Sequence, residues 1–589
     1  MYSLGLNIGH VATAALAKDG KVLACVSEER FTKIKNHWGM PDNAINWLLH
    51  EYNIGINRID KVVVPSCNVR GFLFIKDLLN KKIDPRFRAV PELNWWTRLK
   101  YNSPMVSNLT ISTVGAYQRI NGKKLIEKDR KLLAKHLKIT ENKVIFIDHH
   151  EAHALTCAYN ADQSKKWLIF TLDGEGGTIC SSVNIWDGKK LRKLASTPYY
   201  KSIGKFYEGI TTYLGMKSFE HEYKVMGLAP YAKEKYAKET YEILKKIIWL
   251  DPKNPLVFDS KFPTYLTELF LKDKMSRYRF DNIAAGAQLL VEELLTEWVK
   301  YAVKKYKISN VALAGGVFMN VKANKKIMEL TEVKDMFVFP SCGDESLAIS
   351  AAQKGYEIYC EENKQKHVVT PIKELYLGPS YSNEIIEKYL TKKGYNKKYI
   401  MEWHPDINKK IAELLAKNII VARCTNRMEF GARALGNRSI LCNPSNYDNI
   451  RILNELVKDR DFWMPFTPSM LKEREEEYII NPKKIAAPYM ILTFDTTPKA
   501  QKDIVAAVHP YDFTARPQIV EREWNPDYYE ILKCFENITG TGGVLNTSFN
   551  LHGLPIAMTP ADAMHVFENS SLKCLAMGNW MVRKKETKQ

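Results

Sequence analysis

The chain has 589 residues, of which 45% are hydrophobic and 26% charged, and its formal net charge is +20. This length predicts two to four domains, and the composition is typical of ordinary globular proteins. The sequence has no run of 18 apolar residues, no basic leader with a cleavage site and no CxxC pair among its ten cysteines. We therefore expect a cytoplasmic protein with no membrane span and no membrane partner, and without a zinc ribbon or a disulfide framework.

The first 29 residues predict a β-hairpin. YSLGLNIG and HVATAALA are followed by Asp19-Gly20-Lys21 and VLACVSEE, and Asp-Gly between apolar runs is typical of a tight turn. The pattern returns in WLIFTLDGEGG and TICSSVNIW, which precede Asp187-Gly188-Lys189. Two glycine-loop hairpins indicate an internal duplication, and such loops let backbone N–H groups approach phosphate. Duplicated hairpins resemble the superfamily of actin, hexokinase and acetate kinase; two unrelated hairpins are the alternative.

Three histidines fall within five positions of DHHEAHALTCAYN, residues 148–160. The preceding run KVIFID (143–148) predicts a short buried strand, and the following residues favour a helix. His149 and His153 are four apart and share one face of that helix. Two imidazoles at this spacing can hold one metal ion with carboxylates from elsewhere, whereas the alternative is a capped helix start with solvent-facing histidines.

A second glycine turn lies in NVALAGGVFMN, residues 310–320. The pattern predicts a strand that enters Gly315-Gly316 and then a helix. In the same superfamily such a turn contacts adenosine and phosphate, because glycine permits a close backbone approach.

Two carboxylates are expected close to the histidines. Asp173 is expected to end the strand after the histidine helix, and Asp344 to follow the strand-like VFP at residues 338–340. Ligand sites in α/β folds gather at the carboxyl ends of strands. We therefore expect His149, His153, Asp173 and Asp344 to form a metal site, with His150 facing away towards substrate or a supporting partner.

Charged residues near 358–375, followed by a proline at 371 and a Gly-Pro turn at 378–379, indicate a linker before a second region. In that region EFGARALGNRS (429–439) places Arg433 and Arg438 around a glycine turn, and arginine forks suit phosphate. The other candidate phosphate or anion ligands are Lys458, Arg460, Arg516, Asn546, Ser548 and Asn550. Surface turns with solvated arginines are the alternative for each segment taken alone.

These segments together resemble the O-carbamoyltransferases, including the tobramycin, cephamycin and nodulation-factor enzymes. The marks are GHVATAALAKDGKVLACVSEERFTKIK, DHHEAHAL, GKFYEGITTYLG, EYKVMGLAPY, LAGGVFMN, MEFGARALGNRSIL, DFTARPQ and VLNTSFNLHGLPI. The resemblance implies an α/β protein with two domains. Residues 1–365 are expected to be actin-like, a duplicated ribonuclease-H-like fold similar to threonylcarbamoyl-tRNA enzymes, with an insertion near 65–140. Residues 371–589 are expected to be YrdC-like.

The resemblance also implies a two-step reaction. ATP, with Mg²⁺, and carbamoyl phosphate give carbamoyl adenylate in the C-terminal domain, where Arg433 is the catalytic arginine. The carbamoyl group then passes to a hydroxyl of a small molecule, aided by iron(II) or another divalent metal. The resemblance assigns adenosine to Gly315, Gly316 and Asn320, and the phosphate or carbamoyl group to Lys224, as a catalytic residue, and to Gly227. His10 is a candidate catalytic residue, as general base or as a group that orients the carbamoyl, and a structural hydrogen-bonding role is the alternative.

Several alternatives remain open in the sequence. The family's HDSA is HVAT here, so an acid is missing beside His10. The aromatic and arginine-rich insertion predicts either a glycoside or polyol site or core packing. The +20 charge is compatible with a tRNA-modifying transferase, yet no basic run interleaved with aromatics appears, so nucleic acid is not the expected partner. A non-catalytic nucleotide-binding regulator is the third function, and a homodimer is an open possibility.

Overall fold

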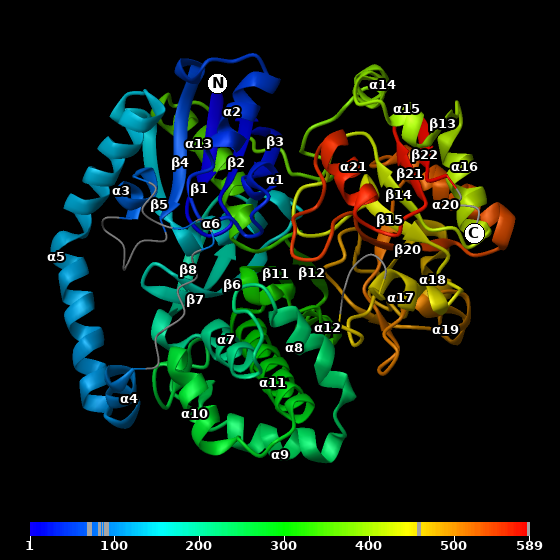
Figure 1. Cartoon of the computed structure of the whole chain (residues 1–589). Coiled ribbons are helices and arrows are strands. Elements are labelled where there is room, and N and C mark those ends of the chain that lie inside the picture. Colours follow the sequence, from blue (N-terminus) through cyan, green and yellow to red (C-terminus); the bar gives the residue numbers. More distant parts are fainter. Residues whose placement is uncertain (67–73, 81–83, 85, 87–93, 456–460, 586–589) are drawn as a thin grey trace. The chain divides into compact units, whose positions relative to one another are not determined.

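The computed structural model describes residues 1–66, 74–80, 84, 86, 94–455 and 461–585. The chain forms two compact units, drawn in Figure 1. The N-terminal unit comprises Met1–Thr32 and Asn36–Ile372, and the C-terminal unit comprises Lys33–Lys35 and Lys373–Gln589. The division at Ile372 lies beside the expected linker. No helix in the described ranges is long and apolar enough to cross a membrane.

The N-terminal unit contains two five-stranded sheets with the same topology. The first has the order β3-β2-β1-β4-β5, and the second has the order β8-β7-β6-β11-β12. In each sheet the first three strands in the chain pair antiparallel, and the last two run parallel to the first. The predicted duplication is therefore confirmed. The strands are β1 (Tyr2–Asn7), β2 (Thr13–Lys18), β3 (Lys21–Ser27), β4 (Ile59–Ser66), β5 (Val144–Asp148), β6 (Trp167–Gly176), β7 (Ile179–Trp186), β8 (Leu191–Pro198), β11 (Asn310–Ala314) and β12 (Asp335–Val338).

The two predicted hairpin turns are present. Asp19 and Gly20 have φ values of 49° and 79°, the left-handed pair that a two-residue turn requires. In the second hairpin the Asp187 carboxylate accepts the backbone N–H groups of Lys189 and Lys190, at 3.0 and 2.8 Å, and closes the turn.

Helices fill the N-terminal unit around these sheets. Helix α13 (Leu347–Glu362) packs on β1 and β4, and α6 (His149–Asn160) packs on β6 and α13. Gly5 permits this packing, because a Cβ there would lie 1.9 Å from a carbonyl oxygen of α13. The remaining helices are α1 (Glu29–Thr32), α2 (Asp42–Glu51), α3 (Phe74–Leu79), α4 (Trp95–Asn102), α5 (Pro104–Leu137), α7 (Ile203–Tyr213), α8 (Glu222–Leu228), α9 (Glu234–Leu244), α10 (Thr267–Lys274), α11 (Phe280–Tyr306) and α12 (Val321–Glu329), and a small hairpin joins β9 (Ile248–Leu250) to β10 (Phe258–Ser260).

The C-terminal unit is built on one mixed sheet of eight strands. In sheet order these are β13 (Ile400–Trp403), β22 (Trp580–Arg583), β21 (Cys574–Met577), β14 (Val421–Cys424), β15 (Arg438–Cys442), β20 (Gly543–Ser548), β16 (Thr467–Leu471) and β19 (Gln518–Val520). A two-stranded sheet of β17 (Phe494–Asp495) and β18 (Thr514–Ala515) accompanies it. The mixed α/β class is confirmed, and the likeness to YrdC stays a prediction.

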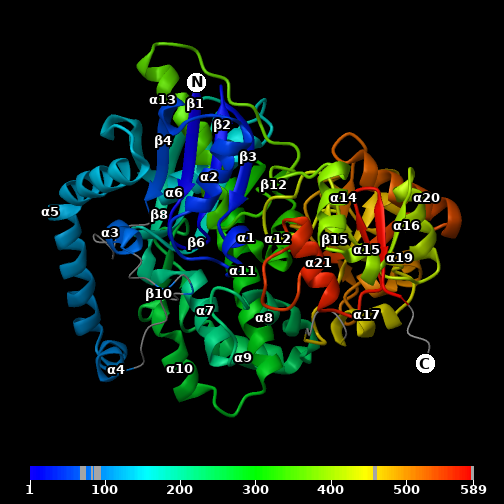
Figure 2. The ribbon, with the colours of Figure 1, turned by 45° about the horizontal axis from the view of Figure 1, so that its top comes forward.

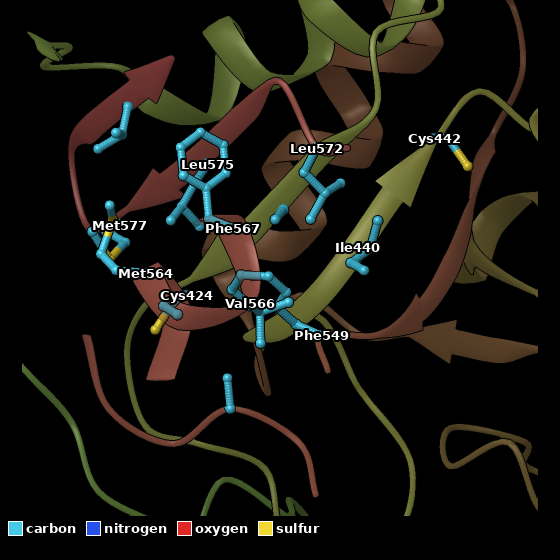
Figure 3. Close-up of a cluster of buried hydrophobic side chains, with 14 of the residues drawn as sticks. Cys424, Ile440, Cys442, Phe549, Met564, Val566, Phe567, Leu572, Leu575 and Met577 are labelled. Carbon is cyan, nitrogen blue, oxygen red and sulfur yellow. The ribbon is translucent and has the colours of Figure 1, made fainter. Parts of the chain in front are cut away.

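Two apolar clusters form the core of this unit. One includes Ile440 of β15, Leu575 of β21 and Phe567 of α21 (Pro560–Glu568), shown in Figure 3. The other joins the sheet to α16 (Ile407–Ala416) and α20 (Pro526–Thr539). The shorter helices are α14 (Asn383–Lys392), α15 (Tyr395–Lys398), α17 (Asp448–Leu453), α18 (Glu475–Tyr478) and α19 (Pro498–Asp503).

Candidate metal centre

Helix α6 presents two imidazoles one turn apart. The Asp148 carboxylate accepts the backbone N–H of Glu151 at 2.8 Å and caps the helix, which therefore begins at His149, directly after β5. The side chains of His149 and His153 are fully buried, and their ring centroids lie 4.7 Å apart. The alternative of solvent-facing histidines is therefore wrong.

Two carboxylates meet these imidazoles. Nε2 of His153 lies 3.1 Å from Oδ2 of Asp173 and 3.5 Å from Oδ1 of Asp344. Nε2 of His149 lies 3.6 and 3.5 Å from the same two oxygens. The four side chains come from α6, β6 and the segment after β12, so residues separated by almost 200 positions in sequence form one cluster.

Irregular backbone positions both aspartates. The expectation that Asp173 ends its strand was wrong, because β6 continues to Gly176. The regular pairing of β6 with β7 nevertheless stops at Leu172. An irregularity of this kind changes the direction in which the following side chains point, here that of Asp173. Asp344 begins a short 3₁₀ turn beyond the end of β12 at Val338.

Burial and mutual charge set the protonation of the cluster. Burial alone would raise the pKa of Asp173, but hydrogen bonds from His149 and His153 outweigh it and hold that pKa well below its usual range. Burial lowers the pKa of His153, and the bond to Asp173 reverses this and raises it. The cluster therefore favours an ionised carboxylate beside its imidazoles.

The donor set fits a divalent transition metal. The four ligand atoms lie within 4.8 Å of one another, and no other such group of His, Cys, Asp or Glu occurs among the residues described. Ligands about 2.0–2.2 Å from a shared metal lie roughly 3–3.5 Å apart, close to the 3.1–3.6 Å found here. Oδ1 of Asp344 is buried without a hydrogen bond in the described structure. Two nitrogens and two oxygens suit iron, zinc and manganese alike.

His10 lies at the edge of this cluster. Its Nδ1 is 3.5 Å from Oδ2 of Asp344, and its side chain is 24% exposed. The ring packs against Trp38 and Phe219, with centroid distances of 5.5 and 5.2 Å. Burial lowers the pKa of His10, but the hydrogen bond and charge of Asp344 outweigh burial and raise it. A partly exposed imidazole paired with a carboxylate suits a general base, and this role stays a prediction.

The residue after His10 has a strained backbone. Val11 has a φ of 50°, in the left-handed region that β-branched residues avoid. The Asn7 amide donates to the carbonyl oxygens of His10 and Val11 at 2.7 and 3.1 Å, and the Thr13 hydroxyl donates to that of Val11 at 2.8 Å. Asp, which the family pattern HDSA places here, tolerates this conformation better than Val.

His150 is not one of the four ligands, although its ring centroid lies 5.4 and 6.0 Å from those of His149 and His153. Its Nδ1 lies 2.8 Å from the Thr171 hydroxyl, and its Nε2 lies 3.2 Å from the carbonyl oxygen of Ile179. Burial lowers the pKa of His150 well below its usual range, so the ring is neutral, with Nε2 donating and Nδ1 accepting. His150 thus joins α6 to β6 and β7 of the second sheet and fixes the helix that carries His149 and His153.

The predicted glycine turn lies directly against the aspartate loop. Gly315 has a φ of 105°, and a Cβ there would lie 2.3 Å from the carbonyl oxygen of Leu172. A Cβ on Gly316 would lie 3.1 Å from Oδ1 of Asp173. Asn320 caps α12 and exchanges two hydrogen bonds with Gln288, at 2.9 and 3.0 Å. The close approach explains both glycines, and nucleotide binding by this turn stays a prediction.

Helices α7 and α8 add buried charges to this region. Lys224 and Gly227 are buried in α8. The sequence interpretation missed Lys205 and Glu208, whose buried ion pair spans 2.9 Å, with the Lys205 ammonium 4.7 Å from the centroid of the Phe219 ring. The pattern that could have revealed this ion pair is the two opposite charges three residues apart in GKFYEG, residues 204–209.

In the C-terminal unit Arg438 is fully buried. Its guanidinium donates to the carbonyl oxygens of Thr425, Asn437 and Met558, at 2.5, 3.1 and 3.2 Å. The sequence interpretation missed Glu429, whose Oε1 accepts the backbone N–H groups of residues 435, 437 and 438. These bonds fix the loop that carries Arg433 and favour a structural role for Arg438, whose substrate contact stays a prediction.

The other predicted anion ligands differ in accessibility. Arg433 and Arg516 are half-buried, whereas Lys458 and Arg460 lie outside the described residues. Asn546 is buried in β20 and donates to the carbonyl oxygen of Ala434 and to the hydroxyl of Ser469. The Ser548 hydroxyl donates to Oδ1 of Asn550 at 2.6 Å.

Comparison with known families decides the class of the protein. Residues 3–353 match the model described as carbamoyltransferase N-terminus, and residues 412–584 match carbamoyltransferase C-terminus. The chain belongs to the carbamoyltransferase family. The resemblance noted in the sequence is therefore confirmed, and family membership implies a transferase.

Similar chains come from several organisms. Nodulation protein NolNO of Sinorhizobium fredii is 28% identical over 98% of this chain and 79% of its own. Nodulation protein NolO of Bradyrhizobium diazoefficiens is 30% identical over 74% and 79%. Among solved structures, full-length HypF in the phosphate- and nucleotide-bound form is 13% identical, with a TM-score of 0.32 over 62% of this chain and 56% of that one. Component A of the Acidaminococcus fermentans (R)-2-hydroxyglutaryl-CoA dehydratase is 12% identical, with a TM-score of 0.31 over 61% and 98%.

Proposed function

We propose that this carbamoyltransferase is ATP-dependent and transfers its carbamoyl group to oxygen. Water cleaves carbamoyl phosphate to carbamate and phosphate, and the carbamate oxygen attacks the α-phosphorus of ATP. Pyrophosphate leaves, and carbamoyl adenylate forms. An acceptor hydroxyl then attacks the carbamoyl carbon, AMP leaves with the bonding electrons, and the hydroxyl proton passes to a base. The observation that carries the proposal is the buried cluster of two histidines and two aspartates beside His10.

The adenylate-forming half belongs to the C-terminal unit. Both substrates are polyanions, and the half-buried Arg433 and Arg516, with Lys458 and Arg460, supply the positive charge that the transition state needs. Mg²⁺ enters with ATP. Arg438 acts through the loop: its bonds to backbone carbonyls hold Arg433 in place. Asn546, Ser548 and Asn550 supply amide and hydroxyl groups for an anion.

The transfer half belongs to the N-terminal unit. His149, His153, Asp173 and Asp344 would hold iron(II) or another divalent metal, which when bound polarises the carbamoyl carbonyl as a Lewis acid. His10 takes the acceptor proton at its Nε2, because Asp344 faces its Nδ1 and stabilises the imidazolium. Gly315, Gly316, Asn320 and Gly227 contact the adenylate, and Lys224 contacts its phosphate or carbamoyl group. The acceptor is a hydroxyl-bearing small molecule such as a sugar or natural product.

Pyrophosphate release tests the first half. We expect release from the full chain with ATP, Mg²⁺ and carbamoyl phosphate together, and none when either substrate is omitted. Arg433→Ala should lower the rate about 100-fold or more, whereas Arg451→Ala, an exposed helix position paired with Glu455, should leave it unchanged. Equal rates in the two variants would refute the assignment of Arg433.

Acceptor carbamoylation tests the second half. His153→Ala should retain pyrophosphate release and abolish transfer to a panel of sugars and polyols, because only the metal cluster is damaged. Loss of both reactions in a folded His153→Ala protein would contradict the division of the chemistry between the two units.

A further inference from the structure

Helices α4 and α5 carry exposed apolar side chains that the metal centre does not use. Met105 is 81% exposed, Trp95 73% and Leu109 63%. Within the N-terminal unit, α5 lies outside β5, which is an edge strand of the first sheet (Figures 1 and 2). Helix α4 lies at the N-terminal end of α5. Folded proteins normally bury side chains of this size, so an exposed group of them indicates a contact with another surface.

The two helices form a well-anchored element. Asn94 caps α4 by accepting the N–H groups of Trp96 and Thr97, each at 3.1 Å, and Ser103 caps α5. The Tyr101 ring packs edge-on against Phe262 at 5.1 Å. The C-terminal end of α5 buries Leu133 and Leu137 and packs on β5. Both α4 and the C-terminal end of α5 are therefore packed on the rest of the N-terminal unit, while Trp95, Met105 and Leu109 remain exposed.

The segment that forms these two helices is strongly basic. Residues 94–138 contain ten Lys and Arg against two acids, so this segment supplies eight of the +20 net charge. Leu109, Lys123, Lys124 and Lys131 are exposed, and at about 100° per residue the three lysines fall within roughly 60° of Leu109 on the helix. The half-exposed Glu127, which pairs with Arg130, is the acid on this side. One side of α5 thus presents apolar residues near its N-terminus and lysines towards its C-terminal end.

We propose that α4 and α5 bind peripherally to an anionic lipid surface. Trp95, Met105 and Leu109 would enter the interface between headgroups and acyl chains, and the lysine row of α5 would lie along the headgroups. A second copy fits less well, because a two-fold contact would place this basic face against itself. Nucleic acid would use the lysines but not the aliphatic Met105 and Leu109. This contact departs from the expectation of no membrane partner, which rested on the lack of an apolar run long enough to span a bilayer; a peripheral contact needs no such run.

Vesicle co-sedimentation of the full chain tests the proposal. We expect binding to vesicles of phosphatidylcholine with about one-third phosphatidylglycerol, weakened at high salt, and little binding to phosphatidylcholine alone. Lys124→Glu/Lys131→Glu should lower the partition coefficient about 25-fold or more, at about fivefold per charge removed. Trp95→Ser/Met105→Ser should lower it about tenfold or more.

Matched controls keep the result interpretable. Lys235→Glu/Lys238→Glu on α9 and Phe280→Ser on α11 change exposed residues of the same unit away from α4 and α5, and should bind as the parent does. No binding of the parent to anionic vesicles at low salt, or equal losses in the controls, would overturn the proposal. A second result would also overturn it: the parent sediments as a dimer, and Trp95→Ser/Met105→Ser dissociates that dimer without weakening vesicle binding. The assay involves no catalysis, so its result is independent of the proposed reaction.

Discussion

Gly176→Ala is the sharpest test of the metal centre, because it adds one methyl group beside a ligand. A Cβ at residue 176 would lie 2.1 Å from Cδ2 of His149 and 2.8 Å from its Nε2. Ordinary contacts begin at 3.4 Å, so the imidazole must move by about 1.3 Å. Metal–ligand distances tolerate only about 0.2 Å, so His149 would cease to be a ligand. We expect metal affinity to fall about 100-fold and stability to fall by about 1–3 kcal/mol from overpacking.

Two assays separate these effects. Chelator competition with iron(II) or manganese(II) measures affinity, and urea unfolding of the metal-free protein measures stability. In a His149→Ala background the added methyl has room, so Gly176→Ala should there cost less than about 0.5 kcal/mol. Gly55→Ala, where a Cβ meets nothing within 4 Å, is the control. Unchanged metal affinity in Gly176→Ala, or additive stability losses in the double variant, would refute the reasoning.

Three further predictions concern stability, each measured by urea unfolding. Val11→Asn should stabilise the protein by about 1 kcal/mol, because Asn accepts the left-handed backbone that strains Val; a loss of stability would contradict this. Burial raises the pKa of Glu222 from 4.5 to about 7, so the folded state binds the extra proton and stability falls as pH rises between about 5 and 7. Glu222→Gln should remove that slope, and an unchanged slope would exclude Glu222 as its source. Arg438→Ala should cost about 3 kcal/mol or more, because buried carbonyl oxygens lose their donor, and a cost as small as that of Arg451→Ala would contradict the structural role.

Much of the N-terminal unit could be predicted from local sequence. Asp-Gly between apolar runs predicts both hairpins: Asp19 and Gly20 both have a positive φ in the first turn, and Gly188 has one in the second. Asp148 and the spacing of His149 and His153 determine where α6 begins and which face carries the imidazoles. Motif spacing across the whole length was specific enough to identify the carbamoyltransferase family.

What local sequence could not determine depended on contacts between distant residues. Asp173 reaches the imidazoles because the pairing of β6 with β7 becomes irregular after Leu172, which no strand pattern reveals. The sequence predicts Arg438 as a phosphate ligand, but it could not reveal that carbonyl oxygens from segments far apart in the chain surround its guanidinium. The charge and aromatic content of residues 94–138 were visible in the sequence. Only the fold decided that these side chains remain exposed, because only tertiary packing selects which face of a helix is buried.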